Sequence, residues 1–373
     1  AYGYVYLLID NGTLNSVINI LIKALGKKTY LIIPVSMLIF GVLGSTMGIY
    51  EEVYGMVPVF IGIVTALGYD AVVGGAIVFV GVATGFAAAT TNPFSVGIAQ
   101  SIAGISMYSG IEYRILIFIV FEVTVILYLL QYARRVKKDP KKSILYGEER
   151  TLIFPFKQKE AVITVRQKIC LMLFVFTIAM LLYGTTKLGW YINEIAAMYL
   201  MMMIITGITS GYSTDKICKT FIKSTQSMVG SMMVVGFTRG IVLVMQNAKI
   251  SDTIVYYLSS ILYGRTKYIS AIGMLFIQNI INFFITGSSS QAAITMPIMT
   301  PVADIIHLSR QTAVLVYQFG DGFSNMFWPT ACAVECGLMG IPINKWYKFM
   351  APLFLIMVVL QIIFAALSVL VYV

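Results

Sequence analysis

The stretch Gly287-Ser288-Ser289-Ser290-Gln291 interrupts an otherwise apolar segment that runs from about Lys267 to His307. A helix that crosses a membrane without interruption would not gather five small or polar residues at its centre. A helical hairpin that enters the membrane, turns at a polar tip and returns to the same side would place them there. We therefore expect a re-entrant hairpin over residues 267–307.

A second stretch of the same kind lies earlier in the chain, at Gly44-Ser45-Thr46-Met47-Gly48. It interrupts another apolar segment, for which we expect a hairpin over residues 29–68. In both hairpins a tip serine is followed 13 residues later by a Pro-Val pair, which begins at Pro58 in the first hairpin and at Pro301 in the second. This equal spacing indicates an internal repeat.

The composition indicates a membrane protein of the all-α class. The chain has 373 residues, of which 59% are hydrophobic and 11% are charged, whereas soluble domains carry about 25% charged residues. A water-soluble fold could not bury this much apolar surface. We therefore expect a polytopic protein with several membrane-spanning helices.

The net charge of +10 is concentrated in one loop. Eleven Lys and Arg residues lie between Arg134 and Lys168, in a stretch that joins two long apolar segments. The positive-inside rule assigns such a loop, residues 135–167, to the cytoplasm, where it would contact anionic lipid headgroups. The charge therefore predicts a membrane-lipid partner and no nucleic-acid partner.

Each hairpin is followed by a helix that is expected to be interrupted near its middle. Residues 71–107 are interrupted at Thr90-Thr91-Asn92-Pro93, and residues 310–340 at Phe327-Trp328-Pro329-Thr330. Proline removes a backbone donor and disfavours a helical conformation in the residue before it. We therefore expect both helices to unwind at membrane depth.

The order of elements is the same in residues 1–134 and in residues 168–373, which we read as two repeats. Gly85-Phe86 of the first interrupted helix recurs as Gly322-Phe323, 237 residues later. The cytoplasmic loop, together with the three spans expected after it, puts the second hairpin on the opposite face of the membrane; these spans cover residues 168–183, 192–209 and 228–245. The repeats are therefore expected to be inverted, with the two tips approaching the midplane from opposite sides.

The repeat also predicts a segment that this sequence does not contain. Residues 168–239 have no counterpart ahead of Gly3. We therefore expect the native protein to have an N-terminal extension of similar size, with two to three further spans.

Helix ends at the two tips and the two interruptions leave backbone N–H and C=O groups without partners at membrane depth. N-terminal helix ends favour carboxylates and C-terminal ends favour cations. The same small polar residues could instead serve only as helix caps. The residues expected to bind substrate are Gly44, Ser45, Thr46, Glu51, Glu52, Thr91, Asn92, Gly287, Ser288, Ser289, Ser290, Gln291, Asp321 and Asn325.

Three acids among these residues suggest the charge of the substrate. Glu51 and Glu52 follow the first tip by one turn, and Asp321 lies in the second interrupted helix. Intramembrane acids usually mark a transport pathway or pair with a cation. The alternative for the two glutamates is charge compensation at a helix N-terminus, and the alternative for Asp321 is an ion pair with Arg239, the one clear intramembrane base in the sequence. Three acids against one arginine favour a cationic or zwitterionic substrate.

The sequence shows no set of residues for catalysis. It contains no recognisable pairing of nucleophile and base, metal-ligand set or phosphate-binding loop, so we expect neither an enzyme nor a bound cofactor. Cys332 and Cys336 are one helical turn apart, but no further ligand completes a metal site. We interpret both cysteines as small buried residues.

Four motifs give the chain a family resemblance: Gly44–Gly48 with Glu51 and Glu52, Thr91–Phe94, Gly287–Ala293 and Phe319–Asn325. Over essentially its whole length the chain resembles the YfcC-like branch of the anaerobic four-carbon-dicarboxylate carrier family, elevator-type secondary carriers of the ion transporter superfamily. The resemblance implies a homodimer in the bacterial cytoplasmic (inner) membrane, with a scaffold of outer spans and a mobile domain of hairpins and interrupted helices. It also implies exchange of basic amino acids, including arginine–ornithine antiport.

The tips depart from one pattern of the superfamily. Relatives elsewhere in it carry Ser-Asn-Thr at both tips and bind sodium there, whereas the tips here read Gly-Ser-Thr and Ser-Ser-Ser. A sodium ion, where one is bound, would be expected near Ser45, Asn92 and Ser289.

We therefore predict a secondary transporter that exchanges basic amino acids such as arginine, ornithine or lysine. The alternative among carriers is a sodium- or proton-coupled transporter of four-carbon dicarboxylates, which competition by malate or succinate would favour. A third reading, a non-transporting membrane scaffold or enzyme subunit, predicts no thermal shift with any amino acid or dicarboxylate.

Overall fold

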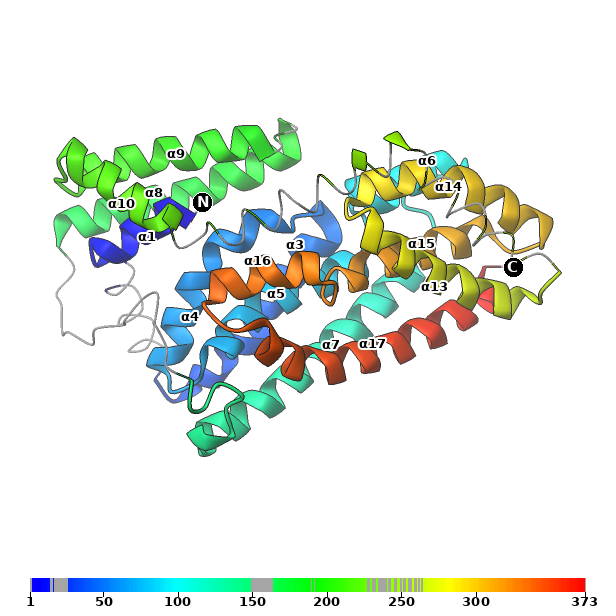
Figure 1. The fold of residues 1–373 in the computed structure, drawn as a ribbon, viewed down its shortest axis with the longest axis horizontal. Coiled ribbons are helices and arrows are strands. Elements are labelled where there is room, and N and C mark those ends of the chain that lie inside the picture. The colour runs from blue at the N-terminus through cyan, green and yellow to red at the C-terminus, as the bar shows by residue number, and fades with distance from the viewer. Residues whose placement is uncertain are drawn as a thin grey trace.

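The structure is a computed structural model, and every regular element in the part that it describes is a helix (Figure 1). It describes residues 2–13, 26–148, 164–188, 192–226 and 264–372, with isolated positions between these ranges. Within them, three helices are long and apolar enough to cross a membrane: Thr29–Met47, Ile111–Lys138 and Ile343–Val371. The expected all-α, polytopic membrane fold is confirmed.

The first repeat contains a helical hairpin, an interrupted helix and a long helix. The hairpin has the arms α3 and α4 with a 3₁₀ segment between them, and the interrupted helix stops at Ala87 and resumes through one π-helical turn after Asn92. The elements are α3 (Ile32–Met47), η2 (Glu51–Met56), α4 (Val57–Ala66), α5 (Ala71–Ala87), η3 (Pro93–Gly97), α6 (Ile98–Ala103) and α7 (Ile111–Lys138). We call residues 44–48 the first tip and residues 88–92 the first break.

The second repeat has the same series of elements. Its hairpin turns between Phe284 and Ser288, and its second helix stops at Ser324 and resumes at Pro329. The elements are α13 (Lys267–Phe284), α14 (Ser288–Ile305), α15 (Arg310–Ser324), α16 (Pro329–Met339) and α17 (Ile343–Val371). We call residues 287–291 the second tip and residues 325–328 the second break.

The packing partners of the two repeats correspond. Helix α3 packs on α5 and α7, as α13 packs on α15 and α17. Each second hairpin arm then crosses to the other repeat, because α4 packs on α16 and α14 packs on α6. Figure 1 shows α14 beside α6 at one end of the molecule and α7 beside α17 along its length. The same contacts are thus made twice, once by each repeat.

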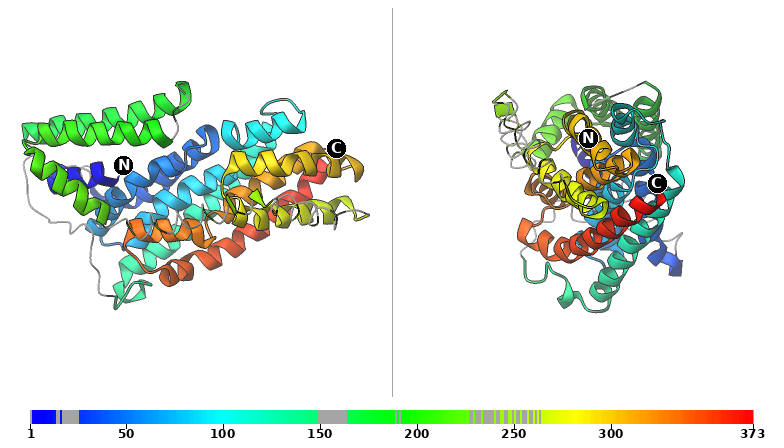
Figure 2. Two further views of the ribbon diagram at one scale, coloured as in Figure 1. Left: turned by 45° about the horizontal axis from the view of Figure 1, so that its top comes forward. Right: turned by 90° about the vertical axis from the view of Figure 1, so that its right-hand side faces the viewer.

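Buried side chains form two separate hydrophobic clusters. The larger cluster holds both hairpins and both interrupted helices, and α7 and α17 belong to it as well. The smaller cluster joins α1 (Tyr2–Asp10), α8 (Val165–Lys187), α9 (Ile192–Thr209) and α10 (Thr214–Gln226). It reaches the first hairpin through Val59 and Ile63 of α4. Figures 1 and 2 show this smaller helical unit lying along one side of the main bundle.

Several expected segments lie outside the described residues. They include most of the span expected at 228–245, Arg239, and residues 149–163 of the basic loop. The described start of that loop is held to the bundle, because Ser143 Oγ and Tyr132 Oη both donate hydrogen bonds to Asp70 Oδ2 at 2.6 Å.

Close helix packing brings α3 onto α5. A Cβ added to Gly85 would overlap the carbonyl group of Gly41, and a Cβ added to Gly44 would overlap the carbonyl oxygen of Val82. In each case the obstacle is backbone, which cannot rotate away as a side chain can. Small residues at this interface therefore set the depth at which the first tip lies against α5.

We expect Gly85→Ala to destabilise the protein, because the new methyl group must push α3 away from α5. Overpacking of this kind costs about 1–3 kcal/mol. Gly97→Ala is the matched control, since its Cβ would come no closer to its neighbours than 3.4 Å from Met107 Cε and 3.7 Å from Asn92 O and Tyr108 Oη. Thermal unfolding in detergent should show a lower midpoint for Gly85→Ala than for Gly97→Ala. Equal midpoints would contradict the packing described here.

Candidate functional site

Carbonyl groups at the end of α5 and at the start of the first break accept hydrogen bonds from three different elements. Gln318 Nε2 of α15 donates to Phe86 O at 2.6 Å, and Ser45 Oγ of the first tip donates to Ala88 O at 3.2 Å. Arg114 Nη1 of α7 donates to Ala89 O at 3.5 Å. A helix end inside a membrane has no water to bond these oxygens. Side chains from distant parts of the sequence therefore stabilise the first break.

The first tip is bound to the first break through both its side chains and its backbone. Ser45 O accepts hydrogen bonds from Thr90 N at 3.0 Å and Thr91 N at 3.2 Å. The hydroxyl groups of Ser45 and Thr90 are 3.1 Å apart, and Thr91 Oγ1 donates to Thr46 O at 3.3 Å. The small size of the tip residues is what permits this backbone-to-backbone approach.

Gly48 closes the first tip against the residues that follow the first break. Its φ of +70° lies in the left-handed region, and a Cβ there would overlap the Asn92 side chain and come within 2.9 Å of the Phe94 ring. Asn92 Oδ1 accepts a hydrogen bond from Phe94 N at 2.9 Å and so caps the resumed helix. Asn92 Nδ2 and Ser95 Oγ are buried and have no hydrogen-bond partner within the described part of the chain.

The second tip is bound to α15 through Asp321. The Asp321 carboxylate is fully buried and accepts hydrogen bonds from Ser288 Oγ and, at 3.1 Å, from Asn282 Nδ2. Tyr317 Oη donates to Ser288 O at 2.7 Å. Both donors to the Asp321 carboxylate are neutral. No Lys or Arg of the described residues forms an ion pair with it, so no cation balances its charge there.

Gln291 ties the second tip to its own hairpin. Gln291 Oε1 accepts a hydrogen bond from Asn282 Nδ2 at 3.0 Å, and Gln291 Nε2 donates to Gln278 Oε1 at 2.7 Å. The side chains of the remaining tip residues Ser289 and Ser290 are exposed. The second tip is therefore fixed on one side and open on the other.

Both tips reach the segment around the first break. Ser289 Oγ of the second tip donates to Phe94 O at 2.9 Å, and the ring of the same Phe94 borders Gly48 of the first tip. In the sequence, Phe94 is notable only as the last residue of the motif Thr91–Phe94, and no role is expected for it. Its position directly after the Asn92-Pro93 interruption was the available signal.

Three carboxylates from three elements lie within electrostatic reach of one tyrosine. Tyr50 follows the first tip, and its phenol interacts with Glu51 of η2, Asp321 of α15 and Glu335 of α16. The Tyr50 hydroxyl is buried and without a hydrogen-bond partner in the described chain. Glu335 is also buried, and its Oε2 accepts a hydrogen bond from Trp346 Nε1 at 3.1 Å. Acids of the second repeat thus lie within electrostatic reach of the residue that follows the first tip.

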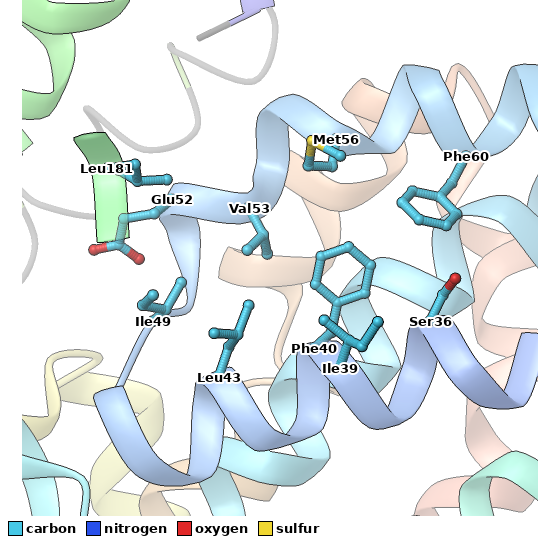
Figure 3. Close-up of a pocket in the computed structure, with 10 residues that line it drawn as sticks. All are labelled: Ser36, Ile39, Phe40, Leu43, Ile49, Glu52, Val53, Met56, Phe60 and Leu181. Atoms are coloured by element: carbon cyan, nitrogen blue, oxygen red, sulfur yellow. The ribbon is translucent and has the colours of Figure 1, made fainter. Parts of the chain in front are cut away.

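Glu52 makes its contacts elsewhere, on the side of the smaller helical unit. Its carboxylate accepts a hydrogen bond from Tyr50 N at 2.8 Å, and its carbonyl accepts one from Tyr199 Oη of α9 at 3.4 Å. Figure 3 shows Glu52 at the edge of an apolar cavity of about 200 Å³, next to Leu181 of α8. Glu51, by contrast, is exposed beside the first tip.

The interpretation of Arg239 as the one clear intramembrane base is wrong, because α7 carries a second. Arg114 is 1% exposed, and its Nε and Nη2 have no partner in the described part of the protein. Glu122 of the same helix is 2% exposed, and both its carboxylate oxygens lack partners there. The hydropathy pattern does not reveal that Arg114 is buried. The residue lies one turn inside its helix, and charged residues are common near the ends of membrane-spanning helices.

The remaining expected site residues are accounted for as follows. Gly44 packs against the backbone of α5. Thr46 Oγ1 donates a hydrogen bond to Val42 O within its own helix, α3. Gly287 is the N-cap of α14, and Asn325 is the half-buried C-cap of α15. Among the described residues, no group of three or more His, Cys, Asp or Glu side chains could hold a metal ion. Cys332 and Cys336 are both buried.

Comparisons with known proteins agree on one family. The family model described as "C4-dicarboxylate anaerobic carrier" matches residues 2–370. The chain is 30% identical, over 95% of its length and 72% of the relative's, to an Escherichia coli K12 protein named "Putative basic amino acid antiporter YfcC". It is 31% identical, over 94% of its length and 70% of the relative's, to an uncharacterised Haemophilus influenzae protein.

Two solved transporters are similar to the chain. The YdaH transporter of Alcanivorax borkumensis has a TM-score of 0.49 and 13% identity, over 98% of this chain and 84% of that one. Neisseria gonorrhoeae MtrF has a TM-score of 0.43 and 17% identity, over 98% of this chain and 80% of that one.

We expect Ser45→Ala to loosen the first tip, because it removes the donor to Ala88 O and leaves that buried carbonyl without its partner. Such a loss costs about 1–3 kcal/mol. Hydrogen–deuterium exchange should become faster in peptides that cover residues 44–48 and 88–92. Thr46→Val is the matched control, because the Thr46 hydroxyl bonds only within its own helix. The same exchange in both variants would show that Ser45 does not hold the tip.

Proposed function

The chain belongs to the C4-dicarboxylate anaerobic carrier family, and on that premise we propose that it exchanges basic amino acids, such as arginine, ornithine and lysine, by an elevator-type mechanism. Membership makes it a membrane transporter rather than an enzyme, and a multi-pass protein of the bacterial cytoplasmic membrane. The substrate, the mechanism, the site residues and a homodimeric assembly are the proposed parts.

The observation that carries the proposal is the convergence of acids on Tyr50. Carboxylates of Glu51, Asp321 and Glu335 come from three elements, and no described lysine or arginine forms an ion pair with any of them. Asp321 and Glu335 are buried, and buried acids without a cation are costly. A guanidinium or ammonium group on the substrate would supply the missing positive charge and charge-assisted hydrogen bonds.

A site for the α-carboxylate of such a substrate lies across the first break. There η3 begins and runs on into α6, and the N-terminal end of a helix favours negative charge. Asn92 Nδ2 is a buried donor without a partner, and Ser95 Oγ can donate as well. The exposed hydroxyl groups of Ser289 and Ser290 border the same segment from the second tip. An amino acid would thus bind with its two ends on different elements.

The division into two hydrophobic clusters supports an elevator motion. In the proposed mechanism the larger cluster, which holds both hairpins and interrupted helices, moves as one body against the smaller helical unit. Helices α7 and α17 move with the larger body, because they share its core. The apolar cavity between the first hairpin and Leu181 lies at the contact of the two bodies (Figure 3).

A four-carbon dicarboxylate is the second candidate substrate. The family description names this class, and the buried Arg114 without an acidic partner would favour an anion. The acids around Tyr50 oppose it, since they would repel a second carboxylate. Sodium near Ser45, Asn92 and Ser289 would offset that repulsion, although the Ser45 carbonyl oxygen is already occupied by Thr90 N and Thr91 N.

We expect purified protein in liposomes to take up labelled arginine when the lumen contains ornithine or lysine, and not when the lumen is empty. Exchange of this kind needs a substrate on both sides. Uptake driven by luminal succinate, with no response to ornithine, would replace the amino-acid proposal with the dicarboxylate one. Unloaded liposomes and liposomes without protein are the controls.

We expect Asp321→Asn and Glu335→Gln each to lower arginine uptake about tenfold or more, since a hydrogen bond to a charged group contributes about 1.5–3 kcal/mol. Both substitutions keep the acceptors for Ser288 and Trp346 while removing the charge. Glu52→Gln is the matched control and should keep most of the uptake, because Glu52 contacts the smaller helical unit. Undiminished uptake in both Asp321→Asn and Glu335→Gln would disprove this site.

A further inference from the structure

Arg114 is a permanent positive charge in the interior of the larger body. The side chain is 1% exposed and forms no ion pair with any acid of the described residues. Glu122, two turns further along α7, is also buried and unpaired. A glutamic acid can take up a proton and become neutral, whereas a guanidinium group stays charged at any physiological pH. Only Arg114 therefore requires a negative partner.

The surroundings of Arg114 provide part of that partner. Its Nη1 donates to Ala89 O at 3.5 Å, and the carbonyl end of α5 contributes a partial negative charge of roughly half a unit. The residues that line a small pocket together with Arg114 are apolar, among them Ala87, Leu315 and Phe319. The donors at Nε and Nη2 are left without acceptors in the described chain. A buried charge in this condition is strongly destabilising unless another anion approaches.

The position of Arg114 relates that charge to the proposed binding site. Arg114 donates to the carbonyl of Ala89, while Ser45 of the first tip bonds to the neighbouring residues Ala88 and Thr90. The free Asn92 amide lies directly after this segment. Only the short first break therefore separates the guanidinium group from the place where a substrate carboxylate would bind. In an interior of low dielectric constant, a charge at this range acts with little screening.

We propose that Arg114 is the residue that selects substrates carrying a carboxylate, by supplying the positive charge behind the first break. The inference rests on the proposed function for the place of binding. The acids around Tyr50 attract the cationic end of the substrate, and Arg114 attracts its carboxylate end. Helix α17 begins 232 residues after α7, so the position equivalent to Arg114 is Trp346. The second repeat therefore offers no equivalent charge, and the substrate binds in one orientation.

The selection has a physical basis in charge compensation. An amine that lacks the carboxylate would satisfy the acids but leave the Arg114 charge unbalanced. An amino acid with the same side chain balances both. Arg114 therefore acts as a specificity-determining residue that need not touch the substrate, because its charge reaches the carboxylate across the break.

The test compares arginine with agmatine, which is arginine without its carboxylate, and ornithine with putrescine. Binding to the purified full chain is measured by thermal shift and by competition with labelled arginine. Wild-type protein should prefer each amino acid over its amine. Arg114→Gln should weaken arginine binding about tenfold or more and leave agmatine binding unchanged or tighter, so that the preference disappears. Arg134→Gln, at an exposed arginine of the same helix, is the matched control.

Arg114→Lys keeps the positive charge and should keep the preference for amino acids. This variant therefore separates the effect of the charge from the effect of the shape of the guanidinium group. If Arg114→Gln does not fold, loss of the preference in Arg114→Lys would overturn the inference and its retention would support it. Equal weakening of arginine and agmatine in Arg114→Gln, or no change in either, would also overturn it. If wild-type protein instead binds succinate and neither arginine nor ornithine, the proposed function fails. Weaker succinate binding in Arg114→Gln would then still support the role of Arg114, and unchanged succinate binding would refute it.

Discussion

The structure depends on satisfying the backbone of helix ends that lie where no water is available. At the first break, the carbonyl groups of Phe86, Ala88 and Ala89 accept hydrogen bonds from α15, the first tip and α7. These donors come from residues 232, 43 and 25 positions away in the sequence. Since the helix cannot bond its own last carbonyls, the hairpin, α15 and α7 must all be in place before the break is stable. The break thereby couples the two repeats into one body.

The repeat architecture could be predicted from sequence because its signals are local. Small polar residues at a tip and proline at an interruption mark the backbone directly, and both recur at nearly constant offsets. The charges of the site were harder to place. Glu51 and Glu52 are adjacent in sequence, yet Glu51 lies with the acids around Tyr50 and Glu52 with α8 and α9. Which way a side chain points from a short 3₁₀ segment is decided by tertiary packing, which the sequence does not display.

The roles of Arg114 and Phe94 also could not be predicted from the sequence, for a different reason. Arg114 lies four residues after Gly110, where a charged residue ordinarily marks the membrane surface, but its long side chain turns inward to Ala89. Phe94 looks like an ordinary apolar residue, yet its carbonyl accepts Ser289 and its ring borders Gly48. A long side chain or a backbone carbonyl can make its contact several ångströms away from the Cα atom of its residue. Hydropathy and residue spacing describe only where the Cα atom lies along the chain, so they do not show these contacts.

The two repeats share their packing and differ in their charges, and this difference bears on how an exchanger would work. The second repeat contributes the buried acids Asp321 and Glu335, whereas the first contributes the buried Arg114 together with the buried acids Asp70 and Glu122. In the proposed mechanism the empty carrier would have to move unpaired acids and an unpaired guanidinium group past the smaller helical unit. A bound basic amino acid would neutralise both ends at once. Because uncompensated charge at membrane depth is costly, the loaded body would in this proposed mechanism cross more easily than the empty one. That asymmetry is the physical condition for exchange rather than net uptake.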